Sequence, residues 1–482
     1  MKKNLLFVLP FLPLFLTAQV EQATLLGQWS DDDNIVVVDW LQSRYNEVWG
    51  VAINDAEVGI IGSTMGAHFI DVTDPTNPTQ IALIEGMDTG TDLVHRDYHD
   101  YGGYLYAVAD EGDSGLEIMD LSDLPDSVER VYASNEFIET SHNIFIDEAN
   151  ARLYAVSGRR ANGQQFNVLI LDISNPSDPQ LLAQYPNGIS GVPFPNNHDL
   201  YVRDNVAYVN AGQNGLYVYD FTDATAPLLL GTMTQYPQSG YNHAGWLDEE
   251  GRYYYMLDET HGRDIKTVDV CDFGDIETVH TFDAEATAST SIPHNAIVHC
   301  NRLYVSYYYE GLQVYDLSEN PAEPQRIYEY DTYPGADEAF FAGAWGVYPL
   351  LPSGNILLSD LQTGLYVFAA IEDDCTYDVL ADCDTSNDGT SSVRKNTVVT
   401  DLNIFPQPAG GEVNLSFNVP FGGETDFFLR DMQGKSVQTF SRFVNAGANN
   451  FTFDLRDTPA GLYFLEMRHA EFNATTKVVL NH

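Results

Sequence analysis

A pattern with a period near fifty residues recurs through most of the chain and constrains the fold more than any other feature. Each copy has alternating apolar residues ending in an aspartate, then a turn rich in Asp, Asn and Pro, as in "GLQVYDLSENPAEP". The seven marker positions are Asp71, Asp120, Asp172, Asp220, Asp269, Asp316 and Ala369, separated by 49, 52, 48, 49, 47 and 53 residues. A fixed period of this length is typical of repeat architectures.

Each copy divides into four short strands. The second strand reads like "RLYAVSG", the third carries the marker aspartate, and the fourth follows the turn, as in "QLLAQYP". The turn residues have a physical role, because Asp and Asn hydrogen-bond their own backbone and Pro presets φ. Seven copies of four antiparallel strands predict an all-β fold, a seven-bladed β-propeller over residues 20–370.

The seventh copy lacks its fourth strand, because an acidic segment follows Phe368. The segment "ATLLGQW", from Ala23 to Trp29, resembles the fourth strand "PLLLGTM" of an earlier copy. We therefore expect it to pair with the strand at 365–368, which would close the ring and protect an open sheet edge.

The first nineteen residues are typical of a secretory signal peptide: Lys2 and Lys3 precede a short apolar run and then small residues. No later segment reaches the roughly 18 apolar residues that a membrane helix needs. These features predict an exported chain without a transmembrane segment.

The charge is strongly negative, with 70 acidic against 22 basic residues and a formal net charge of −48. Nucleic acids require a basic footprint, so they are excluded as expected partners. Such a surface is typical of a very soluble protein, or of a protein whose carboxylates bind divalent cations.

The composition changes near the C-terminus. Residues 371–400 are polar and acidic and predict a linker, whereas residues 401–482 alternate in polarity and predict a small β-sandwich of Ig-like type. Oxygen-bearing side chains precede Gly389 in the linker and are candidate calcium ligands, with a solvated linker as the alternative: Asp382, Asp384, Asn387 and Asp388.

Histidines recur at one position of the repeat. When the copies are aligned on their second strands, the residues at the mouth of the first strands are Trp49, His95, His142, His198, His243, His294 and Trp345. First strands line the channel of a propeller, so we expect five imidazoles facing two indoles at one level. The structural alternative is that each histidine only forms hydrogen bonds at the start of its own strand.

A transition metal is the chemical hypothesis for these histidines, since neutral imidazole binds zinc, copper, iron and manganese. Metal–nitrogen bonds of about 2.0–2.1 Å allow only a subset of three or four to reach one ion. Asp97 and Asp199 lie beside His95 and His198, and we expect them on the ligand face, orienting rings or acting as a base.

The repeats resemble the LVIVD repeat, and residues 23–370 resemble the bacterial "choice-of-anchor B" family, above all in "YEYDTYPGADEAFFAGAWGVYPLLPSGNILLSDLQTGLYVF". The C-terminal segment is similar to the type IX secretion sorting domain of Bacteroidetes, in "NIFPQPAGGEVNLSF", "DLRDTPAGLYFLEMR" and "TTKVVLNH". Gln407 departs from that pattern, where Asn is usual. The resemblance implies contact with the type IX machinery and transport to the outer-membrane surface or the medium.

Two functions follow as hypotheses. The first is a secreted or surface-anchored binding protein that uses the histidine-lined channel face for a protein, glycan or small ligand. The alternative is a metal-dependent enzyme, of the oxidase or polysaccharide lyase type. The sequence has no G-x-S-x-G and no H-E-x-x-H motif, which favours binding.

Overall fold

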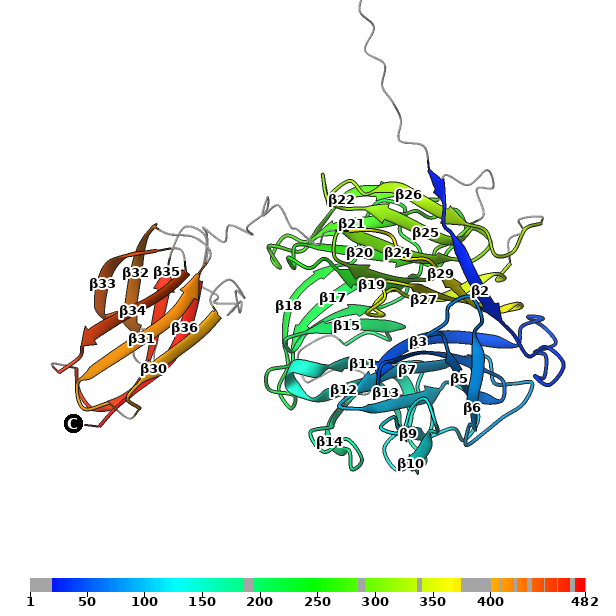
Figure 1. The fold of residues 1–482 in the computed structure, drawn as a ribbon, viewed down its shortest axis with the longest axis horizontal. Helices are drawn as coiled ribbons and strands as arrows, with labels where there is room; N and C mark the ends of the chain where they lie inside the picture. The colour runs from blue at the N-terminus through cyan, green and yellow to red at the C-terminus, as the bar shows by residue number, and fades with distance from the viewer. Residues whose placement is uncertain are drawn as a thin grey trace, which may run out of the picture. The chain divides into compact units, whose positions relative to one another are not determined.

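The computed structural model describes residues 20–185, 194–284, 291–335, 340–373 and 400–481, apart from 408, 420–422, 431–435, 446, 457 and 469–472. The chain divides into two compact units between Thr385 and Ser386 (Figure 1). None of the described residues forms a helix long and apolar enough to cross a membrane.

The described part of the first unit contains seven sheets, each built on four antiparallel strands, which follow chain order in six of them. The first three sheets consist of β3 (Tyr45–Ile53), β4 (Ala56–Ser63), β5 (Gly66–Asp71) and β6 (Thr79–Glu85); β7 (Arg96–Tyr101), β8 (Tyr104–Ala109), β9 (Leu116–Asp120) and β10 (Glu129–Ser134); and β11 (Asn143–Asp147), β12 (Arg152–Arg159), β13 (Gln165–Asp172) and β14 (Gln180–Tyr185). A short 3-10 helix, η1 (Glu148–Asn150), joins β11 to β12.

The next four sheets repeat this plan. They consist of β15 (Asp199–Arg203), β16 (Val206–Asn210), β17 (Leu216–Asp220) and β18 (Leu228–Met233); β19 (Asn242–Leu247), β20 (Tyr253–Asp258), β21 (Ile265–Asp269) and β22 (Glu277–Phe282); β23 (Asn295–His299), β24 (Arg302–Tyr307), β25 (Gly311–Asp316) and β26 (Gln325–Tyr330); and β27 (Ala344–Tyr348), β28 (Ile356–Asp360), β29 (Gly364–Phe368) and β2 (Leu25–Trp29).

The first strands of the sheets form a circle. Each of β3, β7, β11, β15, β19, β23 and β27 contacts the next, and β27 contacts β3. The arrangement is propeller-like, with the first strands at the centre and the fourth strands outside (Figure 1). Residues at the mouths of these seven strands therefore meet around one axis.

The N-terminal strand β2 closes the circle, as predicted. It pairs antiparallel with β29, in a register that joins Leu25 to Phe368 and Trp29 to Leu365. The chain start thus supplies the fourth strand that the seventh repeat lacks. A two-residue strand, β1 (Glu21–Gln22), additionally extends the neighbouring sheet by pairing parallel to β26.

The marker aspartates end the third strands and cap the turns that follow. In all six, Oδ1 accepts a hydrogen bond from the backbone N–H two residues later, at 2.7–3.0 Å. This is the Asx-turn expected from the sequence. It fixes the reversal between third and fourth strands in each of these repeats.

Apolar side chains of neighbouring sheets form the core between them. One cluster joins Ile118 of β9 to Ile146 of β11 and Leu169 of β13, all buried. Each sheet thus stabilises the next, at about 25 cal/mol per Å² of apolar surface buried. Cys271 and Cys300 are both disulfide-bonded, as befits an exported protein.

The second unit has two sheets that share one core. The first contains β30 (Thr400–Phe405), β31 (Glu412–Val419) and β34 (Gly447–Asp454); the second contains β32 (Gly423–Arg430), β33 (Ser436–Val444), β35 (Gly461–Arg468) and β36 (Asn473–Leu480). Buried Leu415 and Phe453 of the first pack with Phe427, Leu465 and Val478 of the second. This is the sandwich arrangement expected from the alternating sequence.

Candidate functional site

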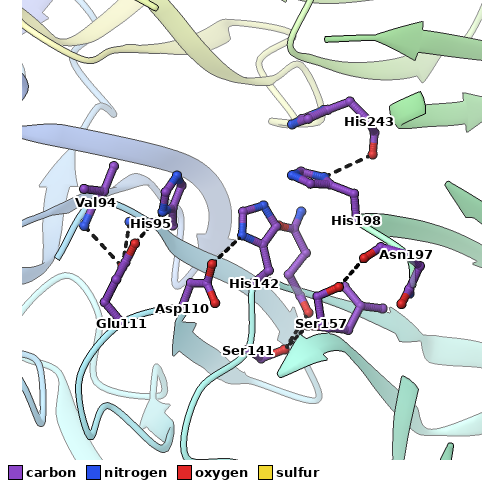
Figure 2. Close-up of polar contacts among 12 residues, drawn as sticks. Val94, His95, Asp110, Glu111, Ser141, His142, Ser157, Asn197, His198 and His243 are labelled. Carbon is purple, nitrogen blue, oxygen red and sulfur yellow. Dashed lines mark hydrogen bonds and ion pairs between the residues drawn. The ribbon is translucent and has the colours of Figure 1, made fainter. Parts of the chain in front are cut away.

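Six aromatic rings form a closed ring at one end of the channel. The distances between neighbouring ring centroids are 5.1, 4.1, 4.0, 4.5, 4.0 and 5.5 Å, in the order His95, His142, His198, His243, His294, Trp345 and back to His95. Figure 2 shows His95, His142, His198 and His243 following one another. The structure thus brings together all five histidines that the repeat alignment selected, and we call them with Trp345 the histidine ring.

The backbone holds these residues at the mouths of the first strands. The N–H groups of His142, His198 and His294 donate to carbonyls of the second strands of their own sheets, at 3.1, 2.7 and 2.9 Å. These backbone hydrogen bonds fix the Cα positions of the three histidines, and their side chains project from these fixed positions. The fold, rather than the loops alone, sets the level of the ring.

Trp49 is not part of the ring, which corrects the sequence-based expectation. It packs against His99 and Tyr348, with centroids 4.4 and 4.9 Å away, and Nε1 donates to Asp100 at 2.8 Å. The reason is its position in the strand: Trp49 pairs with Ile60 inside β3, at the level that Phe145, paired with Tyr154, has in the third sheet.

The first strands of the first and seventh sheets have the same irregularity near their mouths, which in β3 lies between Tyr45 and Val48. A matching bulge in β27, between Ala344 and Val347, contains Trp345. Tyr45 of β3 and Ala344 of β27 are the first paired residues before the bulge in their strands. The residue that follows each of them is therefore equivalent, so Asn46 is the counterpart of Trp345. Asn46 donates to the Val94 carbonyl at 2.9 Å and adds no aromatic ring.

The Nδ1 atoms of the ring have two kinds of partner. His95 and His142 contact carboxylates, at 2.5 Å from Glu111 and 3.0 Å from Asp110 (Figure 2). In contrast, His198 and His294 contact backbone carbonyl oxygens, at 3.2 and 2.6 Å. A carbonyl only accepts, so His198 and His294 carry the proton on Nδ1 and have an unprotonated Nε2 when neutral.

The environment keeps one side of the ring neutral. Burial and the neighbouring imidazoles lower the pKa of His198 and His294 well below the usual value. Burial, with the charge of His142, lowers the pKa of His243 to about 3. On the other side of the ring, the pKa of His95 is raised. Burial acts to lower it, but the hydrogen bond and the negative charge of Glu111 outweigh the effect of burial.

Two groups of side chains are close enough to hold a cation. His95, Asp110 and His142 form one group, and His198, His243 and Glu259 form the other; within each, the ligand atoms lie within 4.8 Å of one another. Tyr308 donates to Glu259 at 2.6 Å and fixes that carboxylate. Both groups combine two imidazoles with one carboxylate.

The sequence reasoning missed Asp110, Glu111 and Glu259, although a signal was present. Asp110 stands ten residues before the marker Asp120, and Glu259 stands ten residues before the marker Asp269. The ends of the second strands lie beside the mouths of the first strands, and alignment at this position would have singled out the two acidic residues.

A layer of buried carboxyl groups lies next to the ring along the channel. Asp97 accepts a hydrogen bond from Ile144 N–H at 2.6 Å, and Asp199 accepts one from Leu200 N–H at 2.7 Å. Glu47 accepts from Asn295 Nδ2 at 2.7 Å. Burial raises the pKa of all three, to about 8 for Glu47 and about 7 for Asp199.

These carboxyl groups line a cavity of about 70 Å³ that reaches an aromatic layer. In that layer His99 contacts Trp49 and Phe145, with centroids 4.4 and 5.3 Å away, and Trp246 contacts Phe145 at 5.7 Å. Asp97 and Asp199 thus lie on the channel, as expected, but they contact backbone N–H groups rather than the histidine rings. Their contact with a ligand stays a prediction.

The candidate calcium ligands of the linker, Asp382, Asp384, Asn387 and Asp388, lie outside the described residues. The predicted signal peptide does as well, so both remain predictions from sequence.

Several solved structures are similar to this chain. They include the periplasmic gluconolactonase of Pseudomonas aeruginosa, 10% identical, covering 86% of this chain and 100% of its own, with a TM-score of 0.48. A putative 6-phosphogluconolactonase from Bacteroides uniformis is 10% identical, with coverages of 86% and 100% and a TM-score of 0.46. The Swd1 β-propeller domain of Myceliophteria thermophila is 12% identical, with coverages of 67% and 96% and a TM-score of 0.46.

No curated protein matches the chain significantly. Two family models do match it. The LVIVD repeat matches residues 164–186 and 196–235, and the secretion system C-terminal sorting domain matches residues 403–481. The chain therefore carries LVIVD repeats in a propeller-like unit and a type IX sorting domain that directs it to the cell surface or outside.

Proposed function

We propose that the chain is an exported surface protein that binds a divalent transition-metal ion at the histidine ring of a seven-bladed propeller. The observation that carries this proposal is the group of His198, His243 and Glu259, whose ligand atoms lie within 4.8 Å of one another. Two imidazoles and one carboxylate are a ligand set used for zinc and iron, and they leave coordination positions open.

The orientation of the imidazoles supports the proposal. Because Nδ1 of His198 and Nδ1 of His294 donate to backbone carbonyls, their Nε2 lone pairs remain for an ion. Such hydrogen bonds to the second nitrogen are what orients metal-binding histidines in known sites. The low pKa of His198 and of His243 keeps both rings neutral, and neutrality is required for coordination.

Charge favours a cation over an anion at this site. Asp110, Glu111 and Glu259 all lie at the ring, and the whole chain has a formal charge of −48. An anionic ligand would meet repulsion, whereas a cation is attracted and concentrated at the surface.

The width of the ring favours a position of the ion off the axis. In a ring of six with centroids 4.0–5.5 Å apart, the centre lies about one such spacing from each centroid. Bonds of about 2.0–2.1 Å cannot span that distance to every histidine. The ion therefore binds to one side, at His198, His243 and Glu259.

The same proposal assigns four parts to the chain: a signal peptide at 1–19, the propeller at 20–370, an acidic linker at 371–400 and an Ig-like sorting sandwich at 401–482. The circle of seven sheets and the closure by β2 support the blade number. The boundary between Thr385 and Ser386 falls within the proposed linker.

A metal-dependent enzyme is the second candidate. The imidazole–carboxylate pairs His95–Glu111 and His142–Asp110 favour it, because such pairs transfer protons in catalysis. Oxidation or cleavage of a polysaccharide by the metal-loaded chain, abolished by chelation, would establish catalysis. Metal-independent capture of a surface ligand would instead support a pure interaction protein.

The test is a zinc titration of the full chain purified without a histidine tag. Competition with a chromophoric chelator should give a dissociation constant that rises at least about 100-fold in His243→Gln, since a lost ligand costs more than the 10- to 100-fold typical of outer partners. His280→Gln is the matched control, because His280 lies on the outer strand β22. Equal affinity in the wild type and both variants would refute the proposed site.

A further inference from the structure

The histidine ring contains a second group with the same chemical composition as the proposed metal site. His95, Asp110 and His142 again supply two imidazoles and one carboxylate within 4.8 Å. A set of this kind leaves positions open on a zinc or iron ion. Nothing in the first site uses these three side chains.

The two carboxylates occupy equivalent places in their repeats. Asp110 lies ten residues before Asp120 and Glu259 lies ten residues before Asp269. In the fourth and sixth sheets the residue at the same place along the second strand is Gly212 and Tyr308, and neither supplies a negative charge at the pH of the experiment. The two acidic repeats are the second and the fifth, so each carboxylate serves a different side of the ring.

One ion cannot serve both groups. In the order of the ring, three contacts separate His95 from His243 in either direction, so these two imidazoles lie opposite each other. Ligand atoms of one ion lie within about 3.5 Å of each other, because each metal bond is about 2.0–2.2 Å. Four of the five histidines therefore divide between two positions, and His294 belongs to neither group.

The second group is prepared for an ion by its contacts. Glu111 lies 2.5 Å from Nδ1 of His95, which orients this ring and leaves its Nε2 for coordination. The Asp110 oxygen lies 3.0 Å from Nδ1 of His142, a separation that two ligands of one ion adopt. The side chains of His95 and Asp110 are 27% and 34% exposed, so an ion can enter from solvent.

We infer that the histidine ring holds two divalent transition-metal ions side by side, the second bound by His95, Asp110 and His142. This inference rests on the proposed function, which supplies the first ion at His198, His243 and Glu259. The adjoining rings of His142 and His198, with centroids 4.1 Å apart, belong to different ions.

The experiment is a measurement of bound zinc per chain, by elemental analysis after equilibrium dialysis of the untagged full chain. The wild type should bind two ions. Asp110→Asn and Glu259→Gln should each bind one, and the double variant none. Asp113→Asn is the matched control, because Asp113 is an exposed carboxylate of the same loop and should leave two ions bound.

The outcomes separate the two claims. One ion in the wild type that Glu259→Gln removes and Asp110→Asn retains would overturn the second site and leave the proposed function intact. One ion that both variants remove would mean a single shared ion and would also overturn it. No bound ion in the wild type would overturn both claims. If Asp110→Asn does not fold, His95→Gln replaces it, since His95 is partly exposed.

Discussion

His294 and Trp345 are joined twice: their ring centroids lie 4.0 Å apart, and Nδ1 of His294 donates to the Trp345 carbonyl at 2.6 Å. His294 precedes β23 of the sixth sheet, whereas Trp345 belongs to β27 of the seventh. Trp345 in turn contacts His95 across the first repeat, with centroids 5.5 Å apart. The Trp345 indole is thus the sixth member of the ring, and its fluorescence should respond to an ion that binds there.

Fluorescence quenching should distinguish Trp49 from Trp345, which the repeat alignment gave as equivalent. Binding of paramagnetic Cu²⁺ at the ring should quench the emission of Trp345, because quenching by a bound ion acts at short range. In Trp345→Phe the quenched component should disappear, whereas Trp49→Phe should retain it, since Trp49 packs on His99 away from the ring. Loss of quenching in Trp49→Phe alone would contradict the assigned register.

Sequence periodicity predicted the strands, the marker turns and the role of Leu25–Trp29, because each depends on local patterns of polarity and turn residues. It also selected the five histidines. It failed for Trp49, because the sequence Trp-Gly-Val occurs in both repeats although Trp49, paired with Ile60, lies three residues further along its strand than Asn46, the true counterpart of Trp345. The carboxylates Asp110 and Glu259 were missed, since they come from a neighbouring strand end rather than from the histidine strands.

Glu47→Gln should stabilise the protein at alkaline pH. Burial raises the pKa of Glu47 to about 8, so the folded state binds this proton more tightly than the unfolded chain does. The stabilisation by the protonated group is complete below the unfolded pKa near 4.5 and is lost as the pH rises through about 8. The variant, which stays neutral, should be more stable at pH 9 by about 2–4 kcal/mol, at about 1.4 kcal/mol per pKa unit.

Thermal unfolding at pH 4.5 and pH 9, with chelator present, measures this difference. Glutamine keeps the hydrogen bonds if the Asn295 amide rotates, because the Asn295 Oδ1 has no hydrogen-bond partner among the described residues. The exposed Glu129→Gln is the control and should change stability at neither pH. A gain at pH 4.5 that is as large as the gain at pH 9 would rule out the titration of Glu47 as its cause.

Gly27→Ala should weaken the closure of the propeller. A Cβ at Gly27, in the middle of β2, would meet the Pro75 carbonyl and the Pro78 ring. Overpacking of this kind costs about 1–3 kcal/mol. Urea unfolding should register that loss, whereas Gly335→Ala, where a Cβ meets nothing within 4 Å, should cost less than about 0.5 kcal/mol. Equal midpoints for the two variants would argue against a structural role for β2.

Removal of the second unit should separate export from folding. In a host with type IX secretion, the chain truncated before Leu402 lacks the domain matched at 403–481. The first unit has its own cores, so the truncated chain should unfold as cooperatively as the full chain while it accumulates in the periplasm. Cell fractionation measures this, and truncated protein at the cell surface would indicate a different export signal.

The central claim is that the histidine ring binds a transition-metal ion, and anomalous diffraction from crystals of the untagged full chain grown with zinc tests it most directly. The account predicts an anomalous peak about 2.0–2.2 Å from His198, His243 and Glu259. It further predicts a second peak at His95, Asp110 and His142. Peaks found only on the outer surface of the propeller, with none within bonding distance of the five histidines, would contradict it.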